Sequence, residues 1–354
     1  MRATLAATLS AFLVALPASA RVSPHVPGEW SPDGARLLVR SCSSTYCADV
    51  GVATRDGRFV ALPPNATLEW SPDGRRAVLE RGEAIYVASP NGTQRRRIAT
   101  GFAASWAPDG RRIAYVDGSM LVVLAVDAGT ARAYPYAPTC TSERCALQLL
   151  DAVWSPDGRR LAVEVTGPWN DIAQPPRNPP SDISILDVAT GVWRVLESQT
   201  TCGASDASWS PDGLYIAWRS NDCEDTPPAT VEIAAVEGSW FTSIRTARFG
   251  WAPRGHRLAY VTAPWVRTRP AGGNRPNGRW YGVDFAWSPD GKKLATVHRG
   301  AIWLGKKRIV VGTHPRWFPG GRWLAFARRT CGESAGIWVR DLRARRDVRL
   351  TRPC

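Results

Sequence analysis

Short apolar runs separated by polar turns recur along most of this 354-residue chain. Each of the clearest runs begins with a basic residue, and such runs occupy residues 76–79, 112–115, 160–163 and 257–260. Runs of this length that are rich in β-branched and aromatic residues and bounded by turn residues predict strands. In most units a second run follows, for example at residues 84–87, 183–186 and 336–339, and a further one at residues 96–99. One unit therefore predicts four strands, which we call A, B, C and D.

A five-residue motif, Trp-Ser-Pro-Asp-Gly in its fullest form, precedes the second strand of each unit. Its copies begin at Trp30, Trp70, Trp106, Trp154, Trp209, Trp251, Trp287 and Trp317. They lie 30 to 55 residues apart, with a mean of 41, which suits four short strands per unit. The sequence thus predicts an all-β fold, a single β-propeller of eight four-stranded antiparallel blades. Seven blades are the alternative, because Pro24 and Pro27 interrupt the stretch that would supply the first strand.

The chemistry of the motif explains why it repeats. Proline presets φ at the second turn position, the Ser and Asp side chains hydrogen-bond nearby amides, and glycine accepts positive φ. The motif therefore reverses the chain between strands A and B. The tryptophan ends strand A, where it can fill the wedge between neighbouring sheets.

These repeats resemble the β-propeller repeat of the TolB family, which also forms the propeller portion of some large serine peptidases. The resemblance covers roughly residues 30–354 and implies the fold of the propeller part only. Two copies depart from the motif: Arg254 replaces the aspartate in the sixth, and the eighth reads Trp-Phe-Pro-Gly-Gly over residues 317–321. We expect weaker turns at these two places.

Residues 1–20 have the features of a secretory signal peptide: an early Arg2, an apolar run at residues 11–16 and a small-residue cleavage site at residues 18–20. The apolar run is shorter than the roughly 20 residues that a membrane span needs. We therefore expect the propeller, residues 21–354, to be exported to the periplasm or the extracellular space without a membrane span in the mature chain.

Eight cysteines support export, because an even count in an exported chain favours disulfides. Spacing alone does not fix their connectivity. In a four-stranded meander, however, the A–B and C–D turns lie on one face, the turn face, and the B–C and D–A connections lie on the other, the loop face. All eight cysteines are predicted on the loop face, and local pairing is expected for Cys42 with Cys47, Cys140 with Cys145, Cys202 with Cys223, and Cys331 with Cys354.

The net charge of +14 has two sources. Eleven cations follow the repeat tryptophans by five or six residues and sit beside six turn aspartates, so we interpret them as a solvated ring on the turn face and expect no nucleic-acid partner. The stretch from about residue 262 to 281 differs, because its arginines alternate with aromatic residues and no acid lies among them. It is predicted to be a B–C excursion on the loop face.

This excursion, helped by Trp169 from a proline-rich stretch at residues 166–181, is the predicted binding site. Arginine can pair with carboxylate or phosphate, and tryptophan can stack on a ring. The alternative is that the tryptophans pack the loop onto its blade. The candidate binding residues are Trp169, Trp265, Arg267, Arg269, Arg275, Arg279, Trp280 and Tyr281.

Two sequence features point only weakly to catalysis. Residues 332–336 match the Gly-x-Ser-x-Gly nucleophile elbow around Ser334, but a strand is predicted where the elbow needs a helix, and no histidine follows His314. His298 and His314, predicted to end strands B and D of the seventh blade, lack a third metal ligand. We expect no catalytic residue, no metal and no cofactor.

The preferred hypothesis is a non-catalytic, monomeric exported propeller that binds a cell-envelope or extracellular protein through its loop face. One alternative is binding of an anionic envelope polymer or glycan through the Arg/Trp stretch. The other is a propeller lyase or hydrolase that uses His298 and His314, or Ser334.

Overall fold

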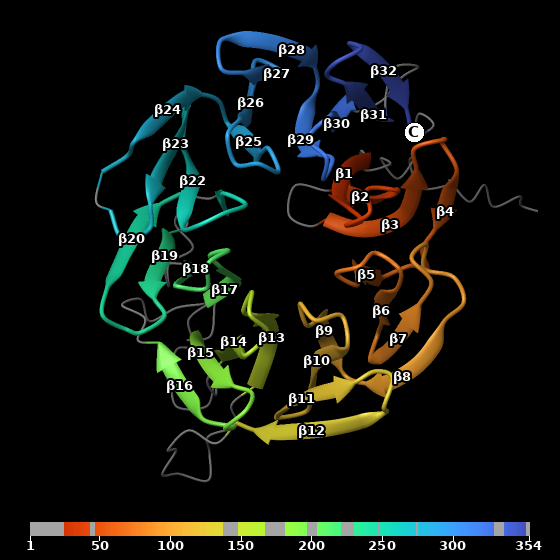
Figure 1. Ribbon diagram of the computed structural model, residues 1–354, viewed down its shortest axis with the longest axis vertical. Coiled ribbons are helices and arrows are strands. Elements are labelled where there is room, and N and C mark those ends of the chain that lie inside the picture. The colour runs from red at the N-terminus through yellow and green to blue at the C-terminus, as the bar shows by residue number, and fades with distance from the viewer. Residues whose placement is uncertain are drawn as a thin grey trace, which may run out of the picture.

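The computed structural model describes residues 25–42, 47–136, 148–166, 181–196, 204–220, 230–246, 248–273, 275–328 and 336–351. These residues form eight four-stranded antiparallel sheets arranged in a ring (Figure 1). The predicted all-β fold with eight blades is confirmed. Within the described ranges, no helix has the length and apolar character needed to cross a membrane.

Every blade is a meander of four consecutive strands. In blades 1 to 4 the strands are β1 His25–Trp30, β2 Arg36–Cys42, β3 Cys47–Thr54, β4 Phe59–Ala61, β5 Ala66–Trp70, β6 Ala77–Arg81, β7 Ala84–Ala88, β8 Arg96–Thr100, β9 Phe102–Trp106, β10 Arg112–Asp117, β11 Met120–Ala125, β12 Thr130–Pro135, β13 Gln148–Trp154, β14 Arg160–Thr166, β15 Ser181–Asp187 and β16 Trp193–Leu196. In blades 5 to 8 they are β17 Ala204–Trp209, β18 Tyr215–Ser220, β19 Thr230–Ala235, β20 Phe241–Arg245, β21 Phe249–Trp251, β22 Arg257–Thr262, β23 Trp265–Pro270, β24 Gly278–Tyr281, β25 Asp284–Trp287, β26 Leu294–His298, β27 Ala301–Leu304, β28 Lys307–Val311, β29 Thr313–Trp317, β30 Trp323–Arg328, β31 Gly336–Asp341 and β32 Arg346–Arg349.

The first strand of each blade lies nearest the centre and the fourth lies at the rim (Figure 1). Strand β1 forms although Pro27 lies within it, and its register with β2 shifts between Pro27 and Trp30. Strand β1 is the inner edge of its sheet and pairs only with β2. On its unpaired side no hydrogen bond is lost because Pro27 lacks an amide hydrogen.

The apolar core lies between neighbouring sheets. One buried cluster, for example, joins Val116 and Leu121 of blade 3 to Leu161 and Val163 of blade 4. Burying each such side chain contributes about 1.5 to 3 kcal/mol relative to leaving it exposed. The blades are therefore held together mainly by apolar side chains that fill the space between adjacent sheets.

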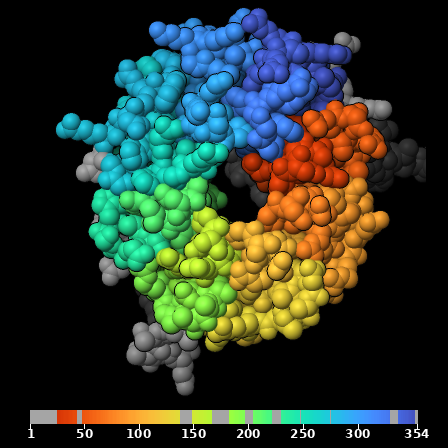
Figure 2. All heavy atoms as spheres, in the orientation of Figure 1, coloured from red at the N-terminus to blue at the C-terminus, as the bar shows by residue number. Residues whose placement is uncertain are grey.

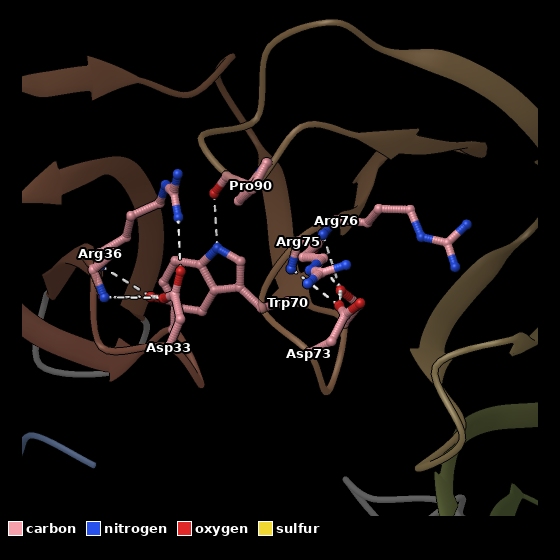
Figure 3. Close-up of polar contacts among 10 residues, drawn as sticks. Asp33, Arg36, Trp70, Asp73, Arg75, Arg76 and Pro90 are labelled. Atoms are coloured by element: carbon pink, nitrogen blue, oxygen red, sulfur yellow. Dashed lines mark hydrogen bonds and ion pairs between the residues drawn. The ribbon is translucent and has the colours of Figure 1, made fainter. Parts of the chain in front are cut away.

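The Ser-Pro-Asp-Gly turns form as the motif predicts. In blade 2 the Ser71 hydroxyl donates to Asp73 Oδ1 at 2.6 Å, and the Arg76 amide donates to Ser71 Oγ at 2.9 Å. The Arg75 amide donates to Asp73 Oδ1 at 3.0 Å (Figure 3). Gly74 has a φ of 69°, a conformation that favours glycine. The bond from the Ser hydroxyl to the Asp carboxylate recurs at 2.6 Å in the turns that begin at Ser31, Ser155, Ser210 and Ser288.

The two aberrant turns differ from each other. In blade 6 the Ala252 amide still donates to the Arg257 carbonyl at 2.7 Å, but neither Ala252 nor Arg254 offers an acceptor side chain to the turn amides. In blade 8 the Gly321 amide donates to the Phe318 carbonyl at 2.8 Å, so the backbone turn is kept. Phe318 stands in place of the serine and packs against blade 1.

The eight tryptophans end the eight inner strands, and most of them link two blades. In six of them the indole Nε1 donates across the blade boundary to the carbonyl of the residue that precedes the tryptophan of the blade before. The donor and acceptor pairs, at 3.0 to 3.4 Å, are Trp154 with Ser105, Trp209 with Val153, Trp251 with Ser208, Trp287 with Gly250, Trp317 with Ala286, and Trp30 with Arg316. We call this set of hydrogen bonds the indole belt.

The belt is interrupted in blades 2 and 3. The Trp70 indole donates at 2.7 Å to the Pro90 carbonyl of its own blade (Figure 3). Trp106 Nε1 is buried and has no hydrogen-bond partner among the described residues. A different kind of link therefore has to join blades 1, 2 and 3.

Carboxylates supply that link. Asp49 of blade 1 accepts the Leu68 amide of blade 2 at 3.1 Å. Glu69 of blade 2 accepts the Trp106 amide of blade 3 at 3.1 Å. Glu80, also of blade 2, accepts the Ala103 and Ala104 amides at 3.0 and 2.7 Å. Three acids thus hold the inner strands at the two boundaries where the indole bonds are absent.

The interpretation of the motif cations as a solvated ring is wrong for several of them. Arg76 stacks over the Trp106 ring of the next blade at 5.0 Å and donates to the Gly110 carbonyl at 2.9 Å. Arg112 contacts Trp154 and the Gly158 carbonyl in the same way, and Arg257 contacts Trp287 and the Gly291 carbonyl. These arginines lie six residues after their tryptophan, at the start of strand B, and so reach the turn of the following blade.

The ring closes by packing between blades 1 and 8, since β32 stays in the sheet of β29, β30 and β31. Phe318 packs edge-on against Trp30, with ring centroids 5.5 Å apart. A side chain at Gly34 would collide with Phe318, because a Cβ there would lie 2.0 Å from that ring. Arg316 pairs with Glu29 at 3.3 Å across the same boundary.

Cys42 is disulfide-bonded, and the register of β2 and β3 places it opposite Cys47. Cys140, Cys145, Cys202, Cys223, Cys331 and Cys354 lie outside the described residues, as do residues 1–20. The four pairings and the signal peptide therefore stay predictions.

The contribution of the indole belt can be measured by replacing Trp209 and Trp106 separately with Phe. Both indoles are buried, but only that of Trp209 donates a hydrogen bond. We expect Trp209→Phe to lower the free energy of unfolding by about 1 to 3 kcal/mol more than Trp106→Phe, because it leaves the Val153 carbonyl without its donor. Urea unfolding followed by circular dichroism gives both values. Equal losses would mean that ring packing alone accounts for the role of these residues.

Candidate functional site

The stretch predicted to be a loop excursion is regular sheet. Residues 265–270 form β23 and residues 278–281 form β24, so the stretch supplies strands C and D of blade 6. The B–C connection is only the Ala263–Pro264 pair, and its peptide bond is cis. Trp265 and Tyr281 lie at the loop-face end of the blade, whereas Arg275 lies in the C–D turn on the opposite face. The predicted position of the whole stretch on the loop face is therefore wrong.

Two of the four predicted arginines point into the protein. Arg269 is buried, and Arg267 lies directly opposite Tyr260 in the register of β22 and β23. Both guanidinium groups act on Tyr260, and burial lowers the pKa of Arg269. Neither Nε atom has a hydrogen-bond partner among the described residues. Arg267 and Arg269 are thus interior residues of blade 6, unlike the exposed Arg275 and Arg279.

Three of the predicted residues, Arg279, Trp280 and Tyr281, line an aromatic pocket between blades 6 and 7. Tyr281, which is 47% exposed, packs edge-on against Trp265 with centroids 4.5 Å apart, and against His298 at the same distance. The Arg279 guanidinium lies 4.0 Å from the centroid of the Trp265 ring. Trp303 adds a further ring 6.4 Å from His298. The pocket has a volume of 520 Å³.

A second pocket, of 630 Å³, lies at the turn-face end of blade 7 and reaches blade 8. Its described lining contains six basic residues and no acidic one. The basic residues are Lys292, Lys293, Lys307, Arg308, Arg340 and Arg345. We call it the basic pocket. Trp280 and Gly305 line both pockets, so the two adjoin each other at the rim.

Most of these cations are exposed, with Arg340 partly buried. Arg340 pairs with Asp347 at 2.9 Å, and for the other five no ion pair occurs within the described ranges. Asp290 lies close to Lys292 and Lys293, but its carboxylate is bound by the Ser288 hydroxyl and the Lys292 amide. The basic pocket therefore keeps a positive field. The motif pattern alone places Lys292 and Lys293 in the ring of turn cations and so does not predict this pocket, although the run Lys306-Lys307-Arg308 is a signal for it.

The centre of the ring is open (Figure 2). Between blades 2 and 4 the opening forms a pocket of 880 Å³ whose described lining includes Glu69, Glu80 and Asp151. Glu164 extends this acidic wall, because the charges of Asp151 and Asp206 both act on it. The sequence analysis missed these acids, although Glu69 precedes the repeat tryptophan by one residue and Asp151 and Asp206 precede theirs by three.

The carboxyl groups of the acidic wall have raised pKa values. Glu69 touches solvent in the channel but protein surrounds it on most sides, and this enclosure raises its pKa to about 7. Burial is also the main reason that the pKa of Glu164 rises to about 8, and the charges of Asp151 and Asp206 act in the same direction. Burial raises the pKa values of Glu80 and Asp151 as well.

Other acids near the channel are paired with arginines. Arg219 contacts Asp206 at 3.1 Å, Arg40 contacts Asp49 at 2.8 Å, and Arg248 pairs with Asp284. The acids of the channel that form no ion pair within the described ranges are therefore Glu69 and Glu80 of blade 2 and Asp151 and Glu164 of blade 4.

The two histidines do not meet. His298 ends β26 and stacks at the rim, whereas His314 lies in β29, the inner strand of blade 8, beside Arg248 and Arg316. The prediction that His314 ends strand D of blade 7 is wrong. Over the described residues, no group of three or more His, Cys, Asp or Glu side chains could hold a metal ion. Trp169 and Ser334 lie outside those residues.

Comparison with known proteins supports the fold. No protein-family model matches the sequence, and no curated protein matches it. Dipeptidyl peptidase 4 of Porphyromonas gingivalis matches 93% of this chain with a TM-score of 0.62 and 11% identity, and the chain spans 59% of the length of that peptidase chain. Oligogalacturonate lyase in complex with manganese matches 93% of this chain and 84% of its own, with a TM-score of 0.51 and 13% identity. At these identities the likeness is one of fold, and the protein is an eight-bladed β-propeller.

The pKa shift of Glu164 predicts how stability depends on pH. Folding raises the pKa of the Glu164 carboxyl from its ordinary value, near 4.5, to about 8. The resulting contribution to stability is fully present at a pH below 4.5 and is lost as the pH rises through about 8. We expect Glu164→Gln to unfold at a higher temperature than the wild type at pH 9, with a smaller difference at pH 5. Glu83→Gln, in the exposed turn between β6 and β7, is the control and should leave the pH profile unchanged. Parallel profiles for all three proteins would contradict this assignment.

Proposed function

We propose that this protein is an exported binding propeller that takes an anionic polymer in the basic pocket on blades 7 and 8. The observation that carries the proposal is the lining of that pocket, with six basic side chains and no acidic one among the described residues. Cations held together without counter-charges repel one another, and an anionic ligand relieves this repulsion. Neither the aromatic pocket nor the pocket in the channel has as many basic residues in its described lining.

A polymer fits the pocket better than a single small anion. The cations come from the A–B turn of blade 7, from β28, and from β31 and the C–D turn of blade 8. Each exposed ion pair contributes only about 0.2 to 1 kcal/mol, so useful affinity needs several pairs at once. A chain with an acidic group on successive units can form several such pairs, and the volume of 630 Å³ is within the range of ligand sites.

The protein-partner hypothesis depended on long connections at the loop face. Residues 167–180 and 221–229, which form two of the three, lie outside the described residues, and the third is sheet. What supports a polymer instead is the charge of the rim. A lyase or hydrolase is favoured only by the likeness in fold to a peptidase and a lyase, which share 11% and 13% identity with this chain.

The proposal predicts a salt-dependent interaction that is lost with the pocket cations. We expect Lys307→Ser combined with Arg308→Ser to weaken binding to polyphosphate by about 2- to 30-fold, which corresponds to two exposed pairs. The matched control is Arg75→Ser combined with Arg111→Ser, which removes the same charge from exposed turns of blades 2 and 3. Isothermal titration calorimetry at two salt concentrations measures each affinity. If both double variants lose affinity equally, net charge rather than the pocket is responsible.

A further inference from the structure

The aromatic pocket and the basic pocket form one composite groove across the rim of blade 7. Trp280 of β24 and Gly305 of the turn between β27 and β28 line both. The aromatic end contains Tyr281 and Trp303, while the basic end contains Lys292 and Lys307. A ligand longer than one pocket can therefore occupy both.

The chemistry of the groove changes along its length. At the aromatic end, Tyr281 is 47% exposed although the rings of Trp265 and His298 pack against it, so its ring is available to a ligand. Exposed aromatic rings offer an apolar face together with polar edges, and this combination suits the C–H face and hydroxyl groups of a sugar. At the basic end the described lining includes only one aromatic residue, Trp280.

This segregation distinguishes between classes of polyanion. A single-stranded nucleic acid carries a phosphate beside every base, so its sites interleave stacking platforms with cations. Here, in the described lining, six basic side chains line the basic end with a single aromatic residue, whereas only Arg279 and Lys306 are basic at the aromatic end, apart from His298. The rings also meet at 68° and 69°, which presents no series of parallel faces for successive bases. A sugar-free polyanion such as polyphosphate would leave the aromatic end unused.

We infer that the ligand of the composite groove is an acidic glycan in which an uncharged sugar neighbours acid-bearing units. The uncharged sugar packs against Tyr281 and Trp303, and its acidic neighbours pair with Lys292, Lys307 and Arg308. This inference rests on the proposed function, because it specifies the ligand of the same site.

The test compares three probes on the same variants. Hyaluronan alternates neutral and acidic sugars, polyphosphate carries no sugar, and oligodeoxythymidylate carries bases. We expect Tyr281→Ser to weaken hyaluronan binding by about 2- to 12-fold, the range for an aromatic packing contact, and to leave polyphosphate binding unchanged. Tyr281→Phe keeps the ring and should bind hyaluronan nearly as the wild type does. The double variant of Lys307 and Arg308 should lose affinity for both polymers.

The outcomes separate the inference from the proposed function. If Tyr281→Ser binds hyaluronan as the wild type does while the Lys307 and Arg308 variant loses polyphosphate, the glycan is wrong and the anionic site stands. If binding of oligodeoxythymidylate is tightest and depends on Tyr281, the ligand is a nucleic acid and the inference is overturned. If the wild type binds neither hyaluronan nor polyphosphate, the proposed function fails as well.

Discussion

The hydrogen bond from a tryptophan indole to the inner-strand carbonyl of the preceding blade sets the geometry of this ring. A propeller has to place its sheets face to face while their inner strands converge, and large rings fill the wedge that this leaves. The indole ring is apolar and also carries an N–H donor. It therefore fills that space, and its hydrogen bond fixes the distance between the inner strands of adjacent blades. The guanidinium groups of Arg76, Arg112 and Arg257 cover the outward face of the next tryptophan and bind its turn. The indole bonds join blades at six boundaries, and these arginines add contacts at three.

Where the indole belt is interrupted, carboxylate groups form the hydrogen bonds that join the inner strands of neighbouring blades. Glu69 and Glu80 reach from blade 2 to backbone amides of blade 3, and they do so from a channel wall that already carries Asp151. A carboxylate in that place satisfies amides but repels its neighbours, which is why burial and like charge both raise pKa values there. The acids of the channel therefore have a structural explanation, whereas the cations at the rim make few contacts within the protein. This contrast is the physical reason for placing the ligand at the rim.

The sequence was sufficient for the fold because the motif carries its own local chemistry. Residues such as Ser71, Asp73 and Gly74 favour a turn, and Trp70 fills the wedge-shaped space between adjacent sheets. Eight copies of the motif therefore predict eight blades. The same reasoning failed at residues 265–281, where arginine and proline obscured the alternation of two ordinary strands. Residue types that are rare in strands were interpreted as loop, although the register pairs Trp265 with Tyr281 and Arg267 with Arg279.

The composite groove could not be predicted from any single repeat, because it arises from a difference in size between blades. Blade 7 belongs to the shortest repeat, 30 residues from Trp287 to Trp317. Its second and third strands have five and four residues, whereas those of blades 6 and 8 have six each. A short blade between two longer ones leaves a recess at the rim, and the side chains that border the recess come from all three. Trp280 from blade 6, Lys307 from blade 7 and Arg345 from blade 8 thus share one pocket although 65 residues separate the first from the last. The spacing of the motif contains the short repeat, but only the packed ring shows that a pocket lies beside it.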